Sequence, residues 1–507
     1  MPRPASLRAT VHDLGVSVFT MTIAGGWRRR RLALAALVCL AMSSAASKPV
    51  RAQAAPADSG VVARLLGAAL ASDRAWIRMS ELCDGIGHRL SGSKSLERAV
   101  TWAEGAMRAD GLDSVWLQPV EVPLWVRGRE SATIVEPGPH AVSMLGLGRS
   151  VGTPRGGITA EVVAVRGWQE LATLPDAAVR GRIVLYNAPF TRYGETVRYR
   201  SRGADSASAR GAVAALVRSV GPVSLRTAHT GTTAGYSGSV PRIPAAAVAI
   251  EDAERIQRLV DRGERVRLRL EMEADTLPDG RSHNVIGEIR GRERPGEIVV
   301  IGGHLDSWDV GAGAHDDAGG CVISMEALRL IRGLGLRPRR TLRCVLWTNE
   351  ENGTRGAKAY AAEYGARERH VAALESDGCV ERPAGFGVKV LESGTDTTDV
   401  AATAAMVERV RPLGRHLAGI GATAITDAGG GADIEPLMKL GVPGFAHRTV
   451  MEHYFDWHHT EADMLDKVDP FELRQNVAAM AIMAWLLAEM EEPPGAADAP
   501  DTARSSR

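Results

Sequence analysis

The chain has 507 residues, too many for one compact domain, so we expect two domains with extensions. Hydrophobic residues make up 45% and charged residues 24%, proportions that are ordinary for a globular protein. The formal net charge of +1 gives no reason to expect nucleic acid or an acidic membrane surface as a partner.

The N-terminus has the pattern of a signal peptide. Four arginines at 28–31 precede the apolar run LALAALVCLAM (32–42), which is short for a membrane span. Small residues at 52–54 supply a cleavage site. We therefore expect residues 1–54 to be a leader and the mature protein to be exported, either periplasmic or secreted. We expect no stable membrane insertion after cleavage; an uncleaved anchor is the alternative.

Residues 55–126 are expected to form the first part of the main domain. Apolar side chains recur at helical spacing over 61–111, with glycines where helices would end. The second helical stretch begins after a serine-rich cap and ends at Gly111. The stretch 114–126 is predicted to be extended.

Residues 127–275 have a different pattern, which we interpret as an inserted β-rich domain. Helices are expected at 205–219 and 251–262. Short β-like runs lie at 158–165, 181–187, 243–250 and 266–274. No cluster of residues here has catalytic geometry. The glycine-rich stretch 229–239 lacks the GK[ST] ending of a phosphate-binding loop, so we predict an ordinary loop.

From residue 276 onward the chain alternates strands with helices up to residue 491. The predicted strands are 297–303, 341–349, 370–377 and 442–447, and the predicted helices are 318–335, 353–366 and 471–491. Alternation of this kind predicts a central sheet with helices on both faces. The tail, 492–507, is expected to be disordered.

Acids and histidines gather where these strands end. His304 and Asp306 follow the first strand, Glu350 and Glu351 the second, and Asp377 ends the third. Sites in open α/β sheets form in the crevice beyond the carboxyl ends of the strands. Further candidates lie on the loops nearby: Asp316, Asp317, His458 and His459.

So many carboxylates cannot share one crevice as bare anions, so they are either protonated or held by cations. Imidazole with carboxylate suits Zn²⁺, with Mn²⁺ and Co²⁺ as substitutes, whereas Ca²⁺ seldom takes histidine. Five or six candidate ligands suggest two metals bridged by one carboxylate, ~3.5–4 Å apart. Glu350 and Glu351 point in different directions, so one can bind metal while the other takes a proton from a water.

Four sequence segments together resemble the co-catalytic zinc exopeptidases, the family of bacterial leucyl aminopeptidase and glutamate carboxypeptidase. They are GGHLDSWDVGAGAHDDAGG (302–320), WTNEENGTRGAKAY (347–360), ESDG (375–378) and HHTEADMLDKVDP (458–470). GIGHRLSGS (85–93) and SHNVIGEIRG (282–291) are similar to the carboxypeptidase Q group in particular. The resemblance implies a three-layer α/β/α domain with a mixed central sheet and an inserted, β-rich, protease-associated-like domain.

The resemblance also implies the roles of individual residues and two Zn²⁺ per chain. His304 and Asp377 would bind one zinc, Glu351 and His459 the other, and Asp316 both. His459 is preferred to His458 because the family's ligand directly precedes Thr or Ser. Glu350 would be the general base, and Asp306 would orient a site histidine. The family often has a cis peptide after the bridging aspartate, here Asp316–Asp317.

Other conspicuous residues have simpler interpretations. Asp309 and Asp317 are expected to cap turns or the following helix, and His315 to be solvated or to line the site. His447 has no assigned role, and His453 is expected on an exposed loop. The four cysteines outside the leader lack CxxC spacing, so we do not expect a cysteine zinc site. Export to an oxidising compartment would allow disulfides among them, and the spacing favours no particular pair.

The expected function is hydrolysis of dipeptides or short peptides. An aminoacylase or amidase on the same scaffold, a single-zinc glutaminyl cyclase and a non-catalytic receptor-like homologue are the alternatives. The retained His304 and Asp377 argue against the cyclase, and the retained Glu350 argues against the receptor. The sequence does not decide between amino- and carboxy-terminal specificity, and a homodimer rests on the resemblance alone.

Overall fold

The computed structural model describes residues 57–234 and 238–495. The expected signal segment and the final twelve residues of the expected disordered tail lie outside the described residues. The described helices of the first part of the chain match the sequence pattern. They are α1 (Ala57–Leu70), α2 (Arg74–Cys83) and α3 (Lys94–Ala109). Ser93 caps α3 by accepting a hydrogen bond from the Leu96 amide, and Gly111 follows its end with a φ of 71°.

The central sheet has eight strands and is mixed, as expected. The order is β1 (Ser114–Val126), β10 (Asp275–Ile289), β12 (Arg340–Trp347), β11 (Arg294–His304), β13 (Arg369–Glu375), β16 (Gly444–Thr449), β14 (Pro383–Lys389) and β15 (Ala424–Thr426). The inner strands β12, β11, β13 and β16 run parallel. β1 and β10 pair antiparallel with their neighbours, and β14 pairs antiparallel with β16 and parallel with β15. The parallel strands are buried on both faces, which explains their continuous apolar sequences.

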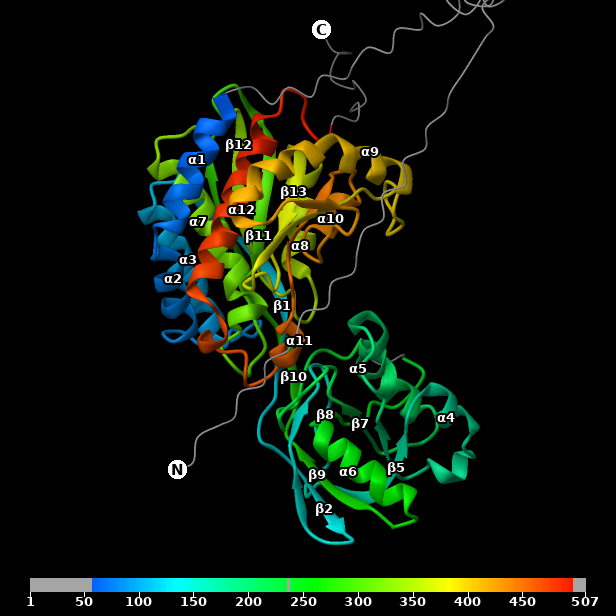
Figure 1. Ribbon diagram of the computed structural model, residues 1–507. Helices are drawn as coiled ribbons and strands as arrows, with labels where there is room; N and C mark the ends of the chain where they lie inside the picture. The colour runs from blue at the N-terminus through cyan, green and yellow to red at the C-terminus, as the bar shows by residue number, and fades with distance from the viewer. Residues whose placement is uncertain (1–56, 235–237, 496–507) are drawn as a thin grey trace, which may run out of the picture. The chain divides into compact units, whose positions relative to one another are not determined.

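Helices cover both faces of this sheet, which gives the three expected layers (Figure 1). Alternate residues of β11 point to opposite faces: Val299 and Ile301 join one apolar cluster, and Ile298 and Val300 join another. The first cluster includes α1, α2, α3, α7 (Gly319–Gly333), α9 (Val400–Val410) and α12 (Pro470–Glu489). The second includes α8 (Arg355–Tyr360) and α10 (Glu435–Met438).

A second eight-stranded sheet is formed within the 127–275 segment. Its order is β3 (His140–Val142), β2 (Glu130–Glu136), β9 (Arg267–Met272), β5 (Ile158–Val165), β6 (Ile183–Tyr186), β7 (Ala214–Arg218), β8 (Ala245–Val248) and β4 (Met144–Gly146). Three helices accompany it: α4 (Trp168–Thr173), α5 (Tyr193–Ser208) and α6 (Ile250–Asp261). Val126 pairs with Asp275 across β1 and β10, so the chain leaves and re-enters the central sheet at neighbouring positions.

One element of this segment was predicted wrongly. The expected helix over 205–219 is instead the end of α5 and the strand β7. The run AALVR has no periodicity that separates a buried strand from a buried helix, and its pairing with β6 and β8 decides the outcome.

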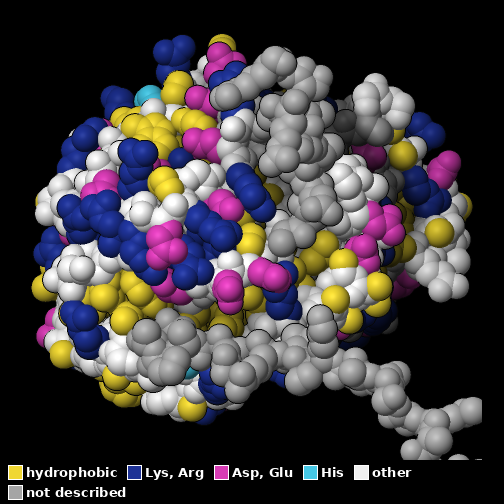
Figure 2. All heavy atoms as spheres, turned by 90° about the horizontal axis from the view of Figure 1, so that it is seen from above, with side chains coloured by type: hydrophobic (Ala, Val, Ile, Leu, Met, Phe, Trp, Pro, Cys, Tyr) yellow, Lys and Arg dark blue, Asp and Glu magenta, His cyan; other side chains and the backbone are white. Residues whose placement is uncertain are grey.

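The remaining described features are ordinary for a globular protein. The four cysteines of the described residues are free and buried. Basic and acidic side chains lie interspersed on the face shown in Figure 2. None of the helices in 57–234 and 238–495 is both long enough and apolar enough for a membrane span.

Candidate metal centre

Three parallel strands deliver acids and a histidine to one edge of the central sheet. β11 ends at His304, Glu350 and Glu351 lie just beyond β12, and Asp377 lies just beyond β13. His304 pairs with Trp347 of β12, and Gly302 with Glu375 of β13, so the three ends are in register. The crevice predicted from the sequence is therefore present at the carboxyl ends of these strands.

The carboxylate of Asp316 lies between two histidines from distant parts of the chain. His304 Nε2 lies 3.1 Å from Asp316 Oδ1, and His459 Nε2 lies 3.1 Å from Asp316 Oδ2. Each histidine also meets a second acid: His304 lies 3.7 Å from Asp377 Oδ1, and His459 lies 3.1 Å from Glu351 Oε2. The five side chains thus form two half-sites that share one carboxylate.

The other ring nitrogen of each histidine faces a carbonyl group. His304 Nδ1 lies 3.0 Å from the backbone oxygen of Asp306, and His459 Nδ1 lies 3.2 Å from that of Thr230. A carbonyl only accepts, so Nδ1 of His304 carries the proton and its neutral ring presents the lone pair of Nε2 to the site. His459 Nδ1 lies near an acceptor, the Thr230 carbonyl oxygen, and also near a donor, the Arg200 guanidinium at 3.3 Å. A lone pair 3.1 Å from a carboxylate oxygen is repulsive unless a proton or a cation lies between them.

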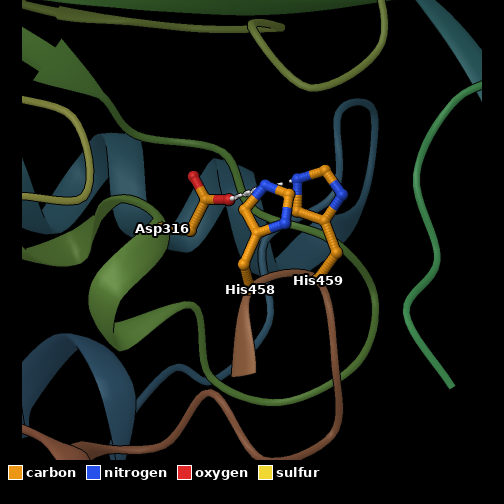
Figure 3. Close-up of side chains that lie close together, drawn as sticks. All are labelled: Asp316, His458 and His459. Atoms are coloured by element: carbon orange, nitrogen blue, oxygen red, sulfur yellow. Dashed lines mark ion pairs between the residues drawn. The ribbon is translucent and has the colours of Figure 1, made fainter. Parts of the chain in front are cut away.

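His458 also reaches Asp316, as Figure 3 shows, but in a weaker position. Its Nε2 lies 3.5 Å from Asp316 Oδ2, and its ring stacks on that of His459 with centroids 3.6 Å apart. Tyr193 and Tyr454 pack against its ring, and it forms no ion pair with Glu351. Three groups of side chains are close enough to hold a cation: Asp316 with His458 and His459, His304 with Asp317 and Asp377, and His304 with Asp316 and Glu351.

Buried polar atoms without hydrogen-bond partners point into this centre. They are His304 Nε2, Glu351 Oε1 and Asp377 Oδ1. Leaving such atoms unpaired away from water is costly. The donor set of imidazole nitrogens and carboxylate oxygens is the one that divalent transition metals prefer, so the residues suit a metal.

Without a cation, the negative charges of the acids are balanced by protons on the neighbouring histidines. Burial opposes ionisation of Asp316, yet the adjacent imidazoles of His304 and His459 hold its pKa well below the usual value. Burial likewise disfavours the charged imidazoles, but the carboxylates around them hold the pKa values of His304 and His459 well above the usual range. Burial and the charge of Asp316 raise the pKa of Glu351 to about 7.

Glu350 lies in the same pocket but makes no ion pair with either histidine of the two half-sites. Burial raises its pKa well above the usual value; His304 opposes the rise, and the charges of Glu351 and Asp377 add to it. A carboxyl group with a raised pKa holds a proton more readily than an exposed glutamate does.

Asp306 makes contacts beyond those that the resemblance implied. Its backbone oxygen lies 3.0 Å from His304 Nδ1, and its carboxylate Oδ1 lies 3.8 Å from the same nitrogen. The carboxylate accepts hydrogen bonds from the amides of Glu350 and Glu351, at 3.1 and 3.3 Å, and from the Ser91 hydroxyl at 3.1 Å. Asp306 therefore fixes the loop that carries the two glutamates.

Three residues that support the centre were missed by sequence reasoning. The buried Arg89 donates to the carbonyl oxygens of Leu305, Ala312 and Gly313, holding the loop between His304 and Asp316. Asp463 accepts hydrogen bonds from the amides of His315 and Asp316. Ser91, the third, belongs with Arg89 to the 85–93 segment, whose only signal in the sequence was its resemblance to the family.

The neighbouring acids support the same loop. Asp317 caps α7 through the Gly320 amide and accepts from the His304 amide. The peptide bond between Asp316 and Asp317 is cis, as the resemblance implied. Asp309 lies away from the histidines and forms a two-point ion pair with Arg127 of the 127–275 segment, at 2.5 and 2.8 Å.

The remaining candidates are not brought to the centre as ligands. His315 is buried rather than solvated, with Nε2 3.2 Å from the Lys467 carbonyl oxygen. His447 is buried against Phe386, and His453 is on an exposed loop, as expected. The thiol of Cys379 is buried and donates to the carbonyl oxygens of Asp377 and His447.

A pocket of about 540 Å³ opens beside the centre. The acids Asp316, Glu350, Glu351 and Asp377 line it together with residues of the 127–275 segment, including Tyr193 and Arg200. The sequence assigned no functional residue to that segment, so this contribution was missed. The pocket has the size of a small-molecule site rather than of a groove for a folded protein.

Comparisons with known proteins agree with this geometry. The model of Peptidase family M28 matches residues 284–484. Carboxypeptidase Q from Bos taurus and from Homo sapiens are each 42% identical to the chain, over 83% of its length and 87% of theirs. The solved structure of a peptidase M28 precursor from Shewanella amazonensis SB2B is 36% identical, with a TM-score of 0.79, covering 86% of this chain and 98% of that one. The fold also matches that of a Bacillus subtilis zinc aminopeptidase, which is 20% identical with a TM-score of 0.61 and covers 83% of this chain and 96% of that one. The chain therefore belongs to Peptidase family M28 and is a metallopeptidase similar to carboxypeptidase Q.

Proposed function

We propose that this protein is an exported exopeptidase that uses two zinc ions to hydrolyse dipeptides or short peptides. The observation that carries the proposal is the position of Asp316, whose two oxygens face His304 and His459 separately. One carboxylate between two half-sites is the arrangement of a dinuclear centre. His304 and Asp377 would hold one zinc, Glu351 and His459 the other, and Asp316 both.

The proposal assigns the proton transfers to Glu350. When bound, the two zinc ions supply a water that is nucleophilic at neutral pH and polarise the substrate carbonyl. Glu350 accepts the proton of the attacking water on its carboxylate and later donates it to the leaving amine. Glu350 directly precedes the proposed ligand Glu351, and Asp306 accepts hydrogen bonds from both backbone amides. This backbone would hold the Glu350 side chain beside the metals without making it a ligand.

Export and the domain division are part of the same proposal. The arginine-rich apolar leader supports export to the periplasm or beyond. The second sheet consists only of strands between residues 130 and 272. The chain leaves the central sheet at Val126 and returns to it at Asp275, which pairs with Val126. Both observations support an inserted domain at 127–275.

A substrate panel with Glu350→Gln as its key variant tests the function. The wild-type enzyme with zinc should hydrolyse free dipeptides, lose activity to a chelator and regain it with zinc. Glu350→Gln should abolish turnover while two zincs stay bound. Loss of both metals in that variant would overturn the role of Glu350, and preference for N-acyl amino acids over dipeptides would identify an aminoacylase instead.

A further inference from the structure

The loop that carries His459 packs against the 127–275 segment. Phe455, which precedes His459 by four residues, lies beside Phe190 and Tyr193, with ring centroids 5.8 and 5.1 Å apart. The sequence assigned no functional residue to this segment. Its contacts with the loop of a proposed zinc ligand indicate that it contributes to the metal centre as well as to the pocket wall.

Thr230 of the same segment contacts His459 both at the backbone and at the ring. Its amide donates to the His459 carbonyl oxygen at 2.9 Å, and its own carbonyl oxygen lies 3.2 Å from His459 Nδ1. When Nε2 binds a metal, the ring proton is on Nδ1, and the Thr230 carbonyl oxygen accepts it. Arg200 donates to that oxygen too, at 3.0 Å, and its two lone pairs accommodate both donors. One residue therefore orients both the backbone and the ring of the ligand.

His459 depends on such contacts more than the other proposed histidine ligand does. Its φ of 60° lies in the left-handed region, which costs a residue with a side chain about 1–2 kcal/mol. Relaxation of this loop would turn the imidazole away from Asp316 and Glu351. His304, in contrast, ends β11 and is held by its pairing with Trp347 in the sheet. The two half-sites therefore differ in what holds their histidines.

Thr230 is itself held by side-chain hydrogen bonds. It is fully buried, its hydroxyl donates to the Gly146 carbonyl oxygen at 2.8 Å, and Arg127 donates to the same hydroxyl at 3.3 Å. Arg127 also forms the ion pair with Asp309, which lies in the loop before Asp316. The contact with His459 is thus connected to the loop that carries the shared carboxylate.

We propose that Thr230 is a positioning residue for the zinc ligand His459, so that the inserted segment supports one of the two half-sites. This inference rests on the proposed function and adds to it what holds one of the metals. The half-site of Glu351 and His459 would depend on the inserted segment, whereas that of His304 and Asp377 would depend on the strand ends of the central sheet.

The test measures zinc affinity in the full-length protein with Thr230→Val, which removes the hydroxyl bond to Gly146 with little change in volume. One of the two zinc dissociation constants should rise about 3- to 10-fold, the equivalent of one lost neutral hydrogen bond, and the other should change by less than about twofold. Thr230→Ser keeps the hydroxyl and should retain the wild-type affinity. Thr233→Val is the matched control, because Thr233 is also buried and both its amide and its hydroxyl donate to the Gly148 carbonyl oxygen.

The variant His459→Ala shows whether the effect passes through this ligand. In that background Thr230→Val should leave the affinity for the remaining zinc unchanged. An equal loss of affinity in both backgrounds, or equal losses for Thr230→Val and Thr233→Val, would overturn the inference and leave Thr230 a structural residue.

Hydrogen exchange gives a measurement that needs no variant. Zinc binding and the contact between Thr230 and His459 stabilise each other, so zinc should slow exchange of the Thr230 amide in the wild type. Equal exchange with and without zinc would overturn the inference. A wild type that binds a single zinc would instead refute the dinuclear proposal, and the affinity for that zinc in the two threonine variants would still decide the role of Thr230.

Discussion

The interactions of Asp306 give a prediction that separates two accounts of this residue. The two carboxylate oxygens of Asp306 accept hydrogen bonds from the backbone amides of Glu350 and Glu351. Asp306→Asn replaces one of these oxygens with an NH2 group, which cannot accept such a bond. A buried hydrogen bond to a charged acceptor contributes about 1.5–3 kcal/mol, and an unsatisfied buried amide costs a similar amount. Both figures describe the loss of the same hydrogen bond, so we expect the free energy of unfolding to fall by about 1.5–3 kcal/mol.

The effect on catalysis follows from the displacement of Glu350. A loss of about 1.5–3 kcal/mol in transition-state stabilisation corresponds to a 10- to 150-fold lower kcat/KM. Steady-state kinetics at saturating zinc, with metal analysis and denaturant unfolding, measure all three quantities. Ser91→Ala is the matched control, because it removes only the hydroxyl donor and should have a smaller effect on kcat/KM.

Two results would refute this reasoning. A kcat/KM within about twofold of wild type would show that the carboxylate does not position the glutamates. If Asp306→Asn instead loses zinc while the molecules that keep zinc have an unchanged kcat, then Asp306 acts by orienting His304, as the family resemblance implied.

Three further predictions concern the metal ligands, the start of α7 and the buried His370. His459→Ala should lower the zinc content by one per chain, whereas His458→Ala should leave it unchanged; the reverse result would exchange their roles. Gly320→Ala should abolish soluble expression or lower stability by about 3 kcal/mol or more, because its Cβ would overlap the backbone oxygen of Ser376; near-wild-type thermal unfolding would contradict this. Burial, and then the charge of Arg343, lower the pKa of His370 to about 4, so the unfolded chain binds a proton there below pH ~6.5 while the folded protein does not. Metal-free protein should therefore lose about 2 kcal/mol from His370 between pH 7 and pH 5, and His370→Gln should reduce the acid destabilisation by that amount; equal pH dependence of the denaturant midpoints would contradict it.

The strand ends could be predicted from the sequence because a parallel sheet has a simple geometry. His304, Glu350 and Asp377 each follow a buried apolar run. Parallel strands end at the same edge of the sheet, so these side chains lie at that edge regardless of how the other segments fold. The resemblance to the zinc exopeptidases selected His459 over His458 in the late loop, which no periodicity connects to the sheet.

Other parts of the site depend on contacts between distant segments and leave no local signal. Asp306 faces the glutamate loop because Ser91, more than 200 positions earlier, packs beside it. Asn349 and His459 adopt left-handed backbone conformations, with φ of 67° and 60°. These conformations cannot be predicted from the residue types. The sequence pattern likewise missed the start of α5, so Arg200 was not recognised as a pocket residue.

The central claim is that Asp316 bridges two zinc ions, and anomalous X-ray diffraction at the zinc edge tests it most directly. The account predicts two zinc positions, each ~2.0–2.2 Å from one oxygen of Asp316. One should be bound by His304 and Asp377 and the other by Glu351 and His459. A single zinc in fully loaded crystals, or a second zinc bound through His458 in place of His459, would contradict it.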